Sequence, residues 1–201
     1  MHPDTTPVHA PARRRRADAQ RNVDALIDAA RTVFATSGVD APAKEITDRA
    51  GVGVGTLCRH FPQRSDLVKA VVQTGIDAVA DAGPALSATH EPAAALTQWI
   101  HRFTELLATK RGLASALHSG DPAFAGLPGH FLARLGPTLA TLLDAAVDEG
   151  TVRADISAED LLQGIAALCQ PVPGRGPEHN PRVVAVLVDG LRRERTPTGI
   201  T

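Results

Sequence analysis

Apolar residues recur at every third or fourth position along most of the chain, which is the spacing of one face of an α-helix. Between positions 21 and 37, for example, Val23, Leu26, Ile27, Ala30 and Phe34 form one such stripe. We find no segment in which apolar and polar residues alternate between turn residues, as they do in a half-buried strand. The pattern predicts an all-α protein with helices over residues 21–37, 42–50, 54–61, 64–82, 91–110, 112–118, 129–149, 157–170 and 181–193.

Glycine and proline set the expected ends of the first four helices. Gly38 follows the first stripe as a C-terminal glycine, and Pro42 suits the first turn of the second helix. Pro62 ends the third helix, because the residue before a proline is displaced from the α conformation. The pair Gly83-Pro84 is expected to end the fourth helix in the same manner.

The N-terminal residues are rich in proline and then in arginine. Residues 1–12 hold three prolines and little apolar mass, and Arg13, Arg14, Arg15 and Arg16 follow them. We expect residues 1–20 to form a disordered basic arm. Such an arm can bind phosphates or enter a DNA minor groove, although a solvated charge run is the simpler interpretation.

The segment over residues 43–61, AKEITDRAGVGVGTLCRHF, has the pattern of a helix-turn-helix unit. Ala50 and Gly51 are small where two helices must approach closely, and Leu57 is apolar where the unit packs inward. Thr56, Arg59 and His60 are polar and spaced so that they can face outward from the second helix. In this arrangement the second helix lies in the major groove, where short polar and basic side chains reach bases and phosphates.

Composition and charge narrow the class of protein. The 201 residues carry a net charge of −1, but residues 1–69 hold 11 Lys/Arg against 8 Asp/Glu, and the remainder is acidic. This asymmetry fits a nucleic-acid module joined to a different domain. Aromatic residues make up only 3 %, which argues against carbohydrate or stacked-RNA binding. We find no membrane span and no signal segment, and the two cysteines fit the reducing cytoplasm, so we expect a cytoplasmic protein without membrane partners.

The helix-turn-helix segment and its flanks resemble the TetR family of bacterial transcriptional regulators. The resemblance covers residues 21–72 and rests on the runs VFATSG (33–38), EI (45–46), RAGV (49–52), GTL (55–57) and RHF (59–61), followed by Arg64 and Leu67. It implies an N-terminal three-helix DNA-binding domain and a C-terminal helical domain for ligand binding and dimerisation. Three positions depart from the family pattern, which usually has Ser at Gly53, Tyr at Cys58 and often Thr at Pro42.

The candidate DNA-binding residues follow from the motif and the resemblance together. The family match implies phosphate contacts from Thr56, His60 and Arg64, while the long side chain of Arg59 can read a guanine edge. Cys58 should contribute less than the usual Tyr, because a thiol is a weak donor. The full set is Arg13, Arg14, Arg15, Arg16, Lys44, Val54, Gly55, Thr56, Arg59, His60 and Arg64.

The C-terminal part offers two candidate surfaces. Most of the aromatic residues gather there with one histidine, either as core or as the lining of an effector pocket: Trp99, Phe103, His118, Phe124 and Phe131. The last two helices have apolar faces so broad that each is either fully buried or at a subunit interface. The family resemblance implies that they pair with those of a second copy, and the candidate interface is Leu161, Ile165, Leu168, Val184, Leu187 and Leu191.

Other chemistries fit the sequence less well. The run Gly51-Val52-Gly53-Val54-Gly55 lacks both the third glycine and the preceding strand of a dinucleotide loop. Neither CxxC nor HxxxH occurs, so we expect no metal and no cofactor. Ser115 and Ser119 lie near His118, but no nucleophile elbow is present, so a small helical enzyme remains only an alternative.

We therefore expect a homodimeric regulator, more a repressor than an activator, that a small-molecule effector releases from a palindromic double-stranded operator. Its expected parts are the arm (1–20), the helix-turn-helix domain (21–66) and the effector-binding and dimerisation domain (67–195). A DNA-binding regulator without a small-molecule ligand is the second hypothesis.

Overall fold

The computed structural model describes residues 10–109, 113–117, 119–176 and 178–193, with only the backbone described for residues 10–16, 114 and 115. The described residues form helices and no strand, which confirms the all-α prediction. The elements are α1 (Ala10–Ser37), α2 (Ala43–Ala50), α3 (Val54–His60), α4 (Arg64–Thr89), α5 (Pro92–Thr109), α6 (Ala114–Leu117), the 3-10 helix η2 (Pro122–Phe124), α7 (Leu127–Asp148), α8 (Ala158–Leu168) and α9 (His179–Leu191).

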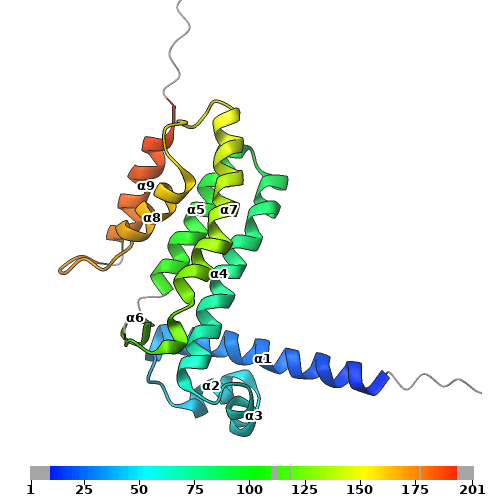
Figure 1. Ribbon diagram of the computed structural model, residues 1–201. Coiled ribbons are helices and arrows are strands. Elements are labelled where there is room, and N and C mark those ends of the chain that lie inside the picture. The colour runs from blue at the N-terminus through cyan, green and yellow to red at the C-terminus, as the bar shows by residue number, and fades with distance from the viewer. Residues whose placement is uncertain (1–9, 110–112, 118, 177, 194–201) are drawn as a thin grey trace, which may run out of the picture.

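Helices α1, α2 and α3 form a small unit at one end of the molecule (Figure 1). Their apolar stripes meet at Leu26, Phe34, Ile46 and Leu57, each of which is buried. The hydroxyl of Ser37 donates to a carboxylate oxygen of Glu45 at 2.8 Å and links the end of α1 to α2. The short helices are thus held against α1 by apolar burial and one polar contact.

Helix α1 begins at Ala10, eleven residues before the predicted start. The prediction of a disordered arm over residues 1–20 is therefore wrong for residues 10–20, whose backbone is helical, while residues 1–9 lie outside the described residues. The run after Ala10 has alanine and arginine at most positions, and both residue types favour a helix even without a buried face.

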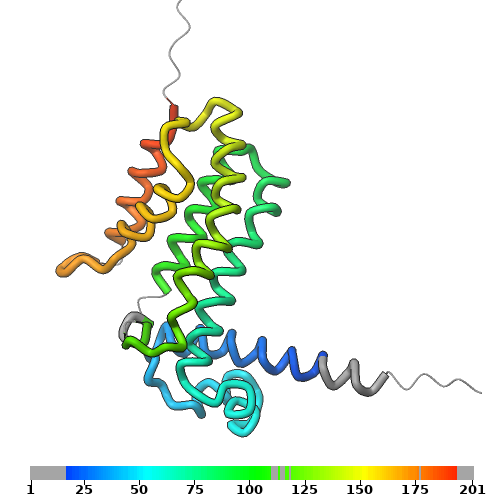
Figure 2. Tube along the Cα trace, in the orientation of Figure 1, coloured from blue at the N-terminus to red at the C-terminus, as the bar shows by residue number. Residues whose placement is uncertain are grey.

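Helix α4 leads from the small unit through the rest of the molecule, as the path of the chain in Figure 2 shows. Gln63 and Asp66 form a reciprocal capping box at its start, with the Gln63 backbone N–H donating to Asp66 at 3.0 Å. Because α4 runs unbroken from Arg64 to Thr89, it crosses the boundary expected between residues 66 and 67. One rigid element therefore belongs to both parts of the chain.

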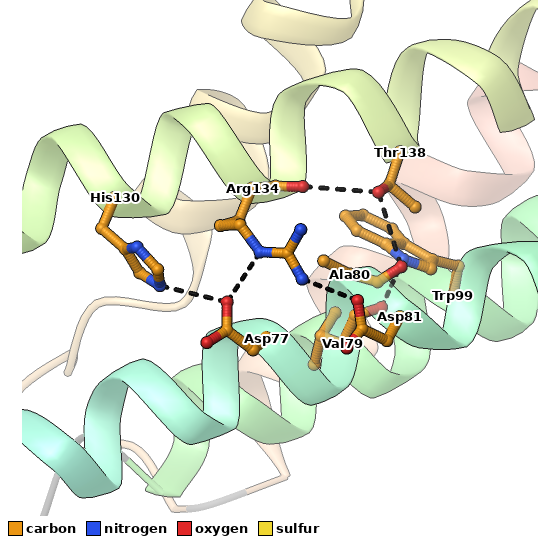
Figure 3. A network of polar contacts seen from close by, with 8 residues as sticks. All are labelled: Asp77, Val79, Ala80, Asp81, Trp99, His130, Arg134 and Thr138. Carbon is orange, nitrogen blue, oxygen red and sulfur yellow. Dashed lines mark hydrogen bonds and ion pairs between the residues drawn. The ribbon is translucent and has the colours of Figure 1, made fainter.

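The pair Gly83-Pro84 lies inside α4, so the prediction that it ends the helix is wrong. Proline has no N–H to donate to the carbonyl four residues earlier, which is that of Ala80. The hydroxyl of Thr138 on α7 lies within hydrogen-bond distance of this Ala80 oxygen, at 3.4 Å, and shares its one proton between that oxygen and the Arg134 carbonyl of its own helix, at 3.3 Å (Figure 3). A Cβ at Gly83 would lie only 2.3 Å from the Thr138 methyl carbon, so the missing side chain is what lets α7 come this close. A neighbouring helix thus compensates for the proline.

The core of the larger part lies among α4, α5 and α7, with α8 and α9 packed along their side (Figure 1). Trp99 and Phe103 on α5 are completely buried, with ring centroids 5.6 Å apart. The indole N–H of Trp99 donates to the Val79 carbonyl at 2.9 Å, which joins α5 to α4. None of the helices in the described ranges is long and apolar enough to cross a membrane.

Candidate nucleic-acid interface

The turn between α2 and α3 has the geometry that the glycines predict. Gly51 takes a left-handed conformation (φ 68°), and its N–H donates to carbonyls in the last turn of α2. The Val52 N–H also donates a hydrogen bond to the Thr47 carbonyl at 3.1 Å. Gly53 then precedes α3 without a side-chain cap, as expected from the absence of serine at this position. Three residues thus connect α2 to α3, and the left-handed Gly51 and the Val52 hydrogen bond hold the turn.

Helix α3 divides into an anchored face and an open face. Leu57 is 6 % exposed and packs into the core beneath the helix. Val54, Gly55, Cys58 and Arg59 are all exposed, and their spacing along the helix places them on one side. This open face consists of one long cation among small side chains, so its backbone can approach another surface closely.

The other predicted contacts of α3 are less open. Thr56 and His60 are partly buried and lie outside the exposed face. Lys44 on α2 is exposed, and its ammonium pairs with Asp48 at 2.5 Å. That ion pair is on the surface and is screened by salt, so it holds the ammonium only weakly.

Arg64 has a structural partner that the sequence did not reveal. Its guanidinium donates to the Ala41 carbonyl at 2.6 Å and lies 5.8 Å from the ring centroid of Phe34. Arg64 therefore links the start of α4 to the α1–α2 connection. Arg13, Arg14, Arg15 and Arg16 lie on the first turns of α1, and their side chains are outside the described residues.

The predicted effector pocket is not one site in this structure. Trp99 and Phe103 have no exposed surface, and Phe131 packs on Phe103 with ring centroids 5.7 Å apart. Trp99 and Phe103 thus pack in the core, which is the first of the two alternatives stated for the aromatic residues. Phe124 lies on η2 beside a separate hollow that Arg64 also lines, and His118 lies outside the described residues.

The residues of the predicted dimer interface also fall into two groups, one buried and one partly exposed. Leu161, Ile165, Val184 and Leu191 are buried within the protomer's own core and leave little surface for a second copy. Leu168 and Leu187 are partly exposed, and Val186, which precedes Leu187 on α9, is 72 % exposed. The broad apolar faces indicated burial for both helices, and in the structure α8 packs mainly on α7 while α9 packs on α8 and α5.

A polar cluster that the sequence analysis missed connects α4 to α7 (Figure 3). The guanidinium of Arg134 donates to Asp77 at 2.7 Å and to Asp81 at 2.6 Å, one helical turn apart on α4. The hydrogen bonds with Asp77 and then Asp81 raise the pKa of Arg134 above its ordinary value. His130 Nε2 lies 3.1 Å from the same oxygen of Asp77, without hydrogen-bond geometry. The i,i+4 spacing of the two aspartates was the available signal, but their partner is more than fifty residues away.

The described residues contain no group of three or more His, Cys, Asp or Glu side chains arranged to hold a metal ion. Of the two cysteines, Cys58 is exposed on α3 and Cys169 is buried at the end of α8. What the small unit offers instead is the open face of α3, with Arg59 among small exposed side chains.

Comparisons with known proteins agree with this geometry. Residues 26–71 match the domain described as bacterial regulatory proteins, tetR family, and residues 91–193 match the SbtR-like transcriptional regulator C-terminal domain. No protein with a curated description matches the chain.

Solved structures are similar over nearly the whole chain. The TetR transcriptional regulator SCO0520 from Streptomyces coelicolor is 33 % identical, with 86 % of this chain and 99 % of that chain covered and a TM-score of 0.68. A TetR regulatory protein from Mycobacterium vanbaalenii is 35 % identical, with 89 % and 99 % covered and a TM-score of 0.69. A gamma-butyrolactone receptor shares the fold at 22 % identity, with 88 % and 91 % covered and a TM-score of 0.59.

The two domain matches and the two relatives above 30 % identity agree with the turn at Gly51 and the open face of α3. The chain belongs to the TetR family of bacterial transcriptional regulators.

Proposed function

We propose that this regulator is a homodimeric repressor whose two α3 helices enter successive major grooves of a palindromic operator. The observation that carries the proposal is the open face of α3 (Val54, Gly55, Cys58 and Arg59), held outward by the buried Leu57. Small side chains let the helix approach the base pairs, and Arg59 supplies the fork that fits a guanine edge. Lys44, Thr56, His60, Arg64 and the four arginines of α1 are proposed as phosphate contacts around it.

The second copy is proposed to dock on the outer face of α8 and α9. Val186 on α9 is a large apolar residue that is 72 % exposed, and Leu187 on α9 and Leu168 on α8 are partly exposed. A palindromic operator requires a two-fold dimer, because each half-site is read by one α3. The interface that we propose is therefore this outward patch, which replaces the buried residues first predicted.

Release by an effector is proposed to act through α4. This helix packs on α1 at one end and on α5 and α7 along its length, and the Arg134 cluster fixes it to α7. A ligand that favours one arrangement of the larger part therefore moves α4 and, with it, the small unit. In the dimer this motion changes the separation of the two α3 helices. Because its target is chromosomal DNA, we propose the cytoplasm as its location.

The proposal is tested by selecting sequences from random duplex DNA with the purified full-length chain. We expect enrichment of an inverted repeat whose half-sites are separated by about one helical turn, ~10–10.5 base pairs, or a multiple of it. Enrichment of a single unrepeated motif would contradict the two-fold arrangement. If the bound DNA showed no enriched sequence at any salt concentration, sequence-specific binding would be contradicted altogether.

A further inference from the structure

Figure 3 shows the ring of His130, near the start of α7, beside the carboxylate of Asp77 on α4. The Nε2 atom of this ring is buried and has no hydrogen-bond partner within the part of the chain that the structure describes. A buried polar atom without a partner is uncommon and calls for an explanation. The same atom lies 3.1 Å from a carboxylate oxygen of Asp77, so a small rotation of the ring would align the two for a hydrogen bond.

The polar cluster between α4 and α7 has one carboxylate more than it has guanidinium groups. Arg134 donates to Asp77 at 2.7 Å and to Asp81 at 2.6 Å, so a single cation serves two anions. The cluster therefore carries an excess negative charge while His130 is neutral, and a protonated imidazole removes that excess. Because His130, Asp77 and Arg134 are all partly buried, this excess charge is screened less than it would be at the open surface.

Other charges around His130 oppose its protonation. The start of α7 carries a partial positive charge of about half an elementary charge, and Arg134 adds a full one a turn further along the same helix. The carboxylates of Asp77 and Asp81 together exceed these two, so the balance favours a cation at His130. Helices α5 and α8 also pack on α7, but none of their described residues forms an ion pair with His130.

We propose that His130 is a proton-dependent latch between α4 and α7. With a proton taken from solvent, the ring donates from Nε2 to Asp77 and pairs with its charge; without that proton, it has no charge to contribute. Histidine is the side chain that ordinarily changes charge between about pH 5 and 8. The folded protein gains from the charged form, so the stabilisation is present at the acid end of this interval and is lost as the pH rises.

The latch acts on the helix that joins the two parts of the molecule. Helix α4 begins at Arg64, whose guanidinium holds the Ala41 carbonyl of the small unit at 2.6 Å. A closed latch at Asp77 ties the middle of this helix to α7 and would oppose the motion of α4 that releases the operator. That consequence rests on the proposed function, whereas the latch itself requires no DNA and is tested without it.

The experiment is thermal unfolding of the full-length protein, followed by circular dichroism at about pH 5.5 and about pH 8 with the ionic strength held constant. Near pH 8 we expect the parent and His130→Gln to melt within about 1 °C of each other. Near pH 5.5 the parent should melt about 2–4 °C higher, the shift expected from one partly buried ion pair in a chain of this length. The other histidines are the same in both proteins, so their effects cancel in this difference.

Two further variants identify the partner. In an Asp77→Asn background, His130→Gln should change the melting temperature equally at both pH values, because the carboxylate that the proton serves is gone. Asparagine keeps an acceptor for Arg134, so this variant is expected to fold. His90→Gln is the matched control and should follow the parent at both pH values, because His90 is exposed and contacts the Thr89 hydroxyl rather than a carboxylate.

The inference is overturned if the parent exceeds His130→Gln by the same amount at both pH values, since the ring would then act only by packing. It is also overturned if His130→Gln melts higher than the parent near pH 5.5, because burial of the charge would then outweigh the pairing. A pH-dependent difference that persists in the Asp77→Asn background would exclude Asp77 as the partner. None of these outcomes involves DNA, so each leaves the DNA-binding proposal intact.

Discussion

Gly83 offers a sharp test of how α4 and α7 are held together. Its missing side chain leaves room for Thr138, whose methyl carbon would lie 2.3 Å from an added Cβ. Real Cβ contacts are more than 3 Å, so Gly83→Ala forces Thr138 to move or to turn. A turn would break the Thr138 hydrogen bond to the Ala80 carbonyl that Pro84 leaves without its helical donor. Over-packing of this kind costs about 1–3 kcal/mol.

Gly136 is the matched control for this substitution. It also precedes a proline inside a long helix, Pro137 in α7, so alanine there meets the same pre-proline restriction. An added Cβ at Gly136 has no other atom within 4 Å. We therefore expect Gly83→Ala to be less stable than Gly136→Ala by about 1–3 kcal/mol in free energy of unfolding. In a chain of this length, each kcal/mol lowers the melting temperature by about 2–4 °C.

Thermal unfolding followed by circular dichroism measures the difference, and Thr138→Ser supplies the rescue. Serine keeps the hydroxyl for the Ala80 carbonyl and removes the methyl carbon that clashes. In the Thr138→Ser background the two alanine variants should therefore melt within about 1–2 °C of each other, because the remaining backbone costs are shared. Equal melting temperatures in the parent background, or no recovery with serine, would refute the close contact between α4 and α7.

Three further predictions concern the dimer, the basic residues of α1 and the core. Leu187→Glu should give monomers in light scattering, while Leu132→Glu, at an exposed leucine on α7, should leave dimers; a dimeric Leu187→Glu variant places the interface elsewhere. Replacement of Arg13, Arg14, Arg15 and Arg16 by glutamine should weaken binding to operator DNA and to random DNA alike. The slope of log K against log salt concentration should become shallower by up to about 0.9 for each phosphate contact that is lost, and an unchanged slope rules out phosphate binding. Trp99→Ala should cost about 3–5 kcal/mol of stability in urea unfolding if Trp99 is core, whereas a small cost would indicate a pocket residue.

The pattern of apolar residues, glycine and proline predicted most helices, because those helices are determined by residues within or next to them. Helices α2 and α3 follow from an apolar stripe bounded by Pro42, Gly51 and Pro62, and the structure places them within one residue of the expected ends. Long-range contacts explain the failures. Thr138, which contacts the Ala80 carbonyl beside Pro84, and Arg134, which completes the polar cluster on α4, are both more than fifty residues away along the chain.

The candidate sites show the same limit. Helical spacing correctly placed Leu57 inward and Arg59 outward, because the burial of one α3 face fixes the other. Helical spacing could not decide which face of α8 or of α9 packs within the protomer, because each helix is apolar around more than half of its circumference. Aromatic clustering was equally ambiguous, because Trp99 and Phe103 have the same spacing in a packed core as around a pocket.

The most direct measurement of the central claim is the affinity of the Arg59→Ala variant for the selected operator and for random DNA, by fluorescence anisotropy at one salt concentration. If α3 reads bases, operator binding should weaken by about 1–3 kcal/mol, roughly 5- to 150-fold, while random DNA binding changes little. His60→Ala should instead weaken both, and Arg102→Ala, an exposed arginine on α5, should weaken neither. A folded Arg59→Ala variant that binds both DNAs more weakly by the same factor, or that binds both as tightly as the parent, would contradict base reading by Arg59. If the Arg59 and His60 variants both bound normally, α3 would not be the recognition helix.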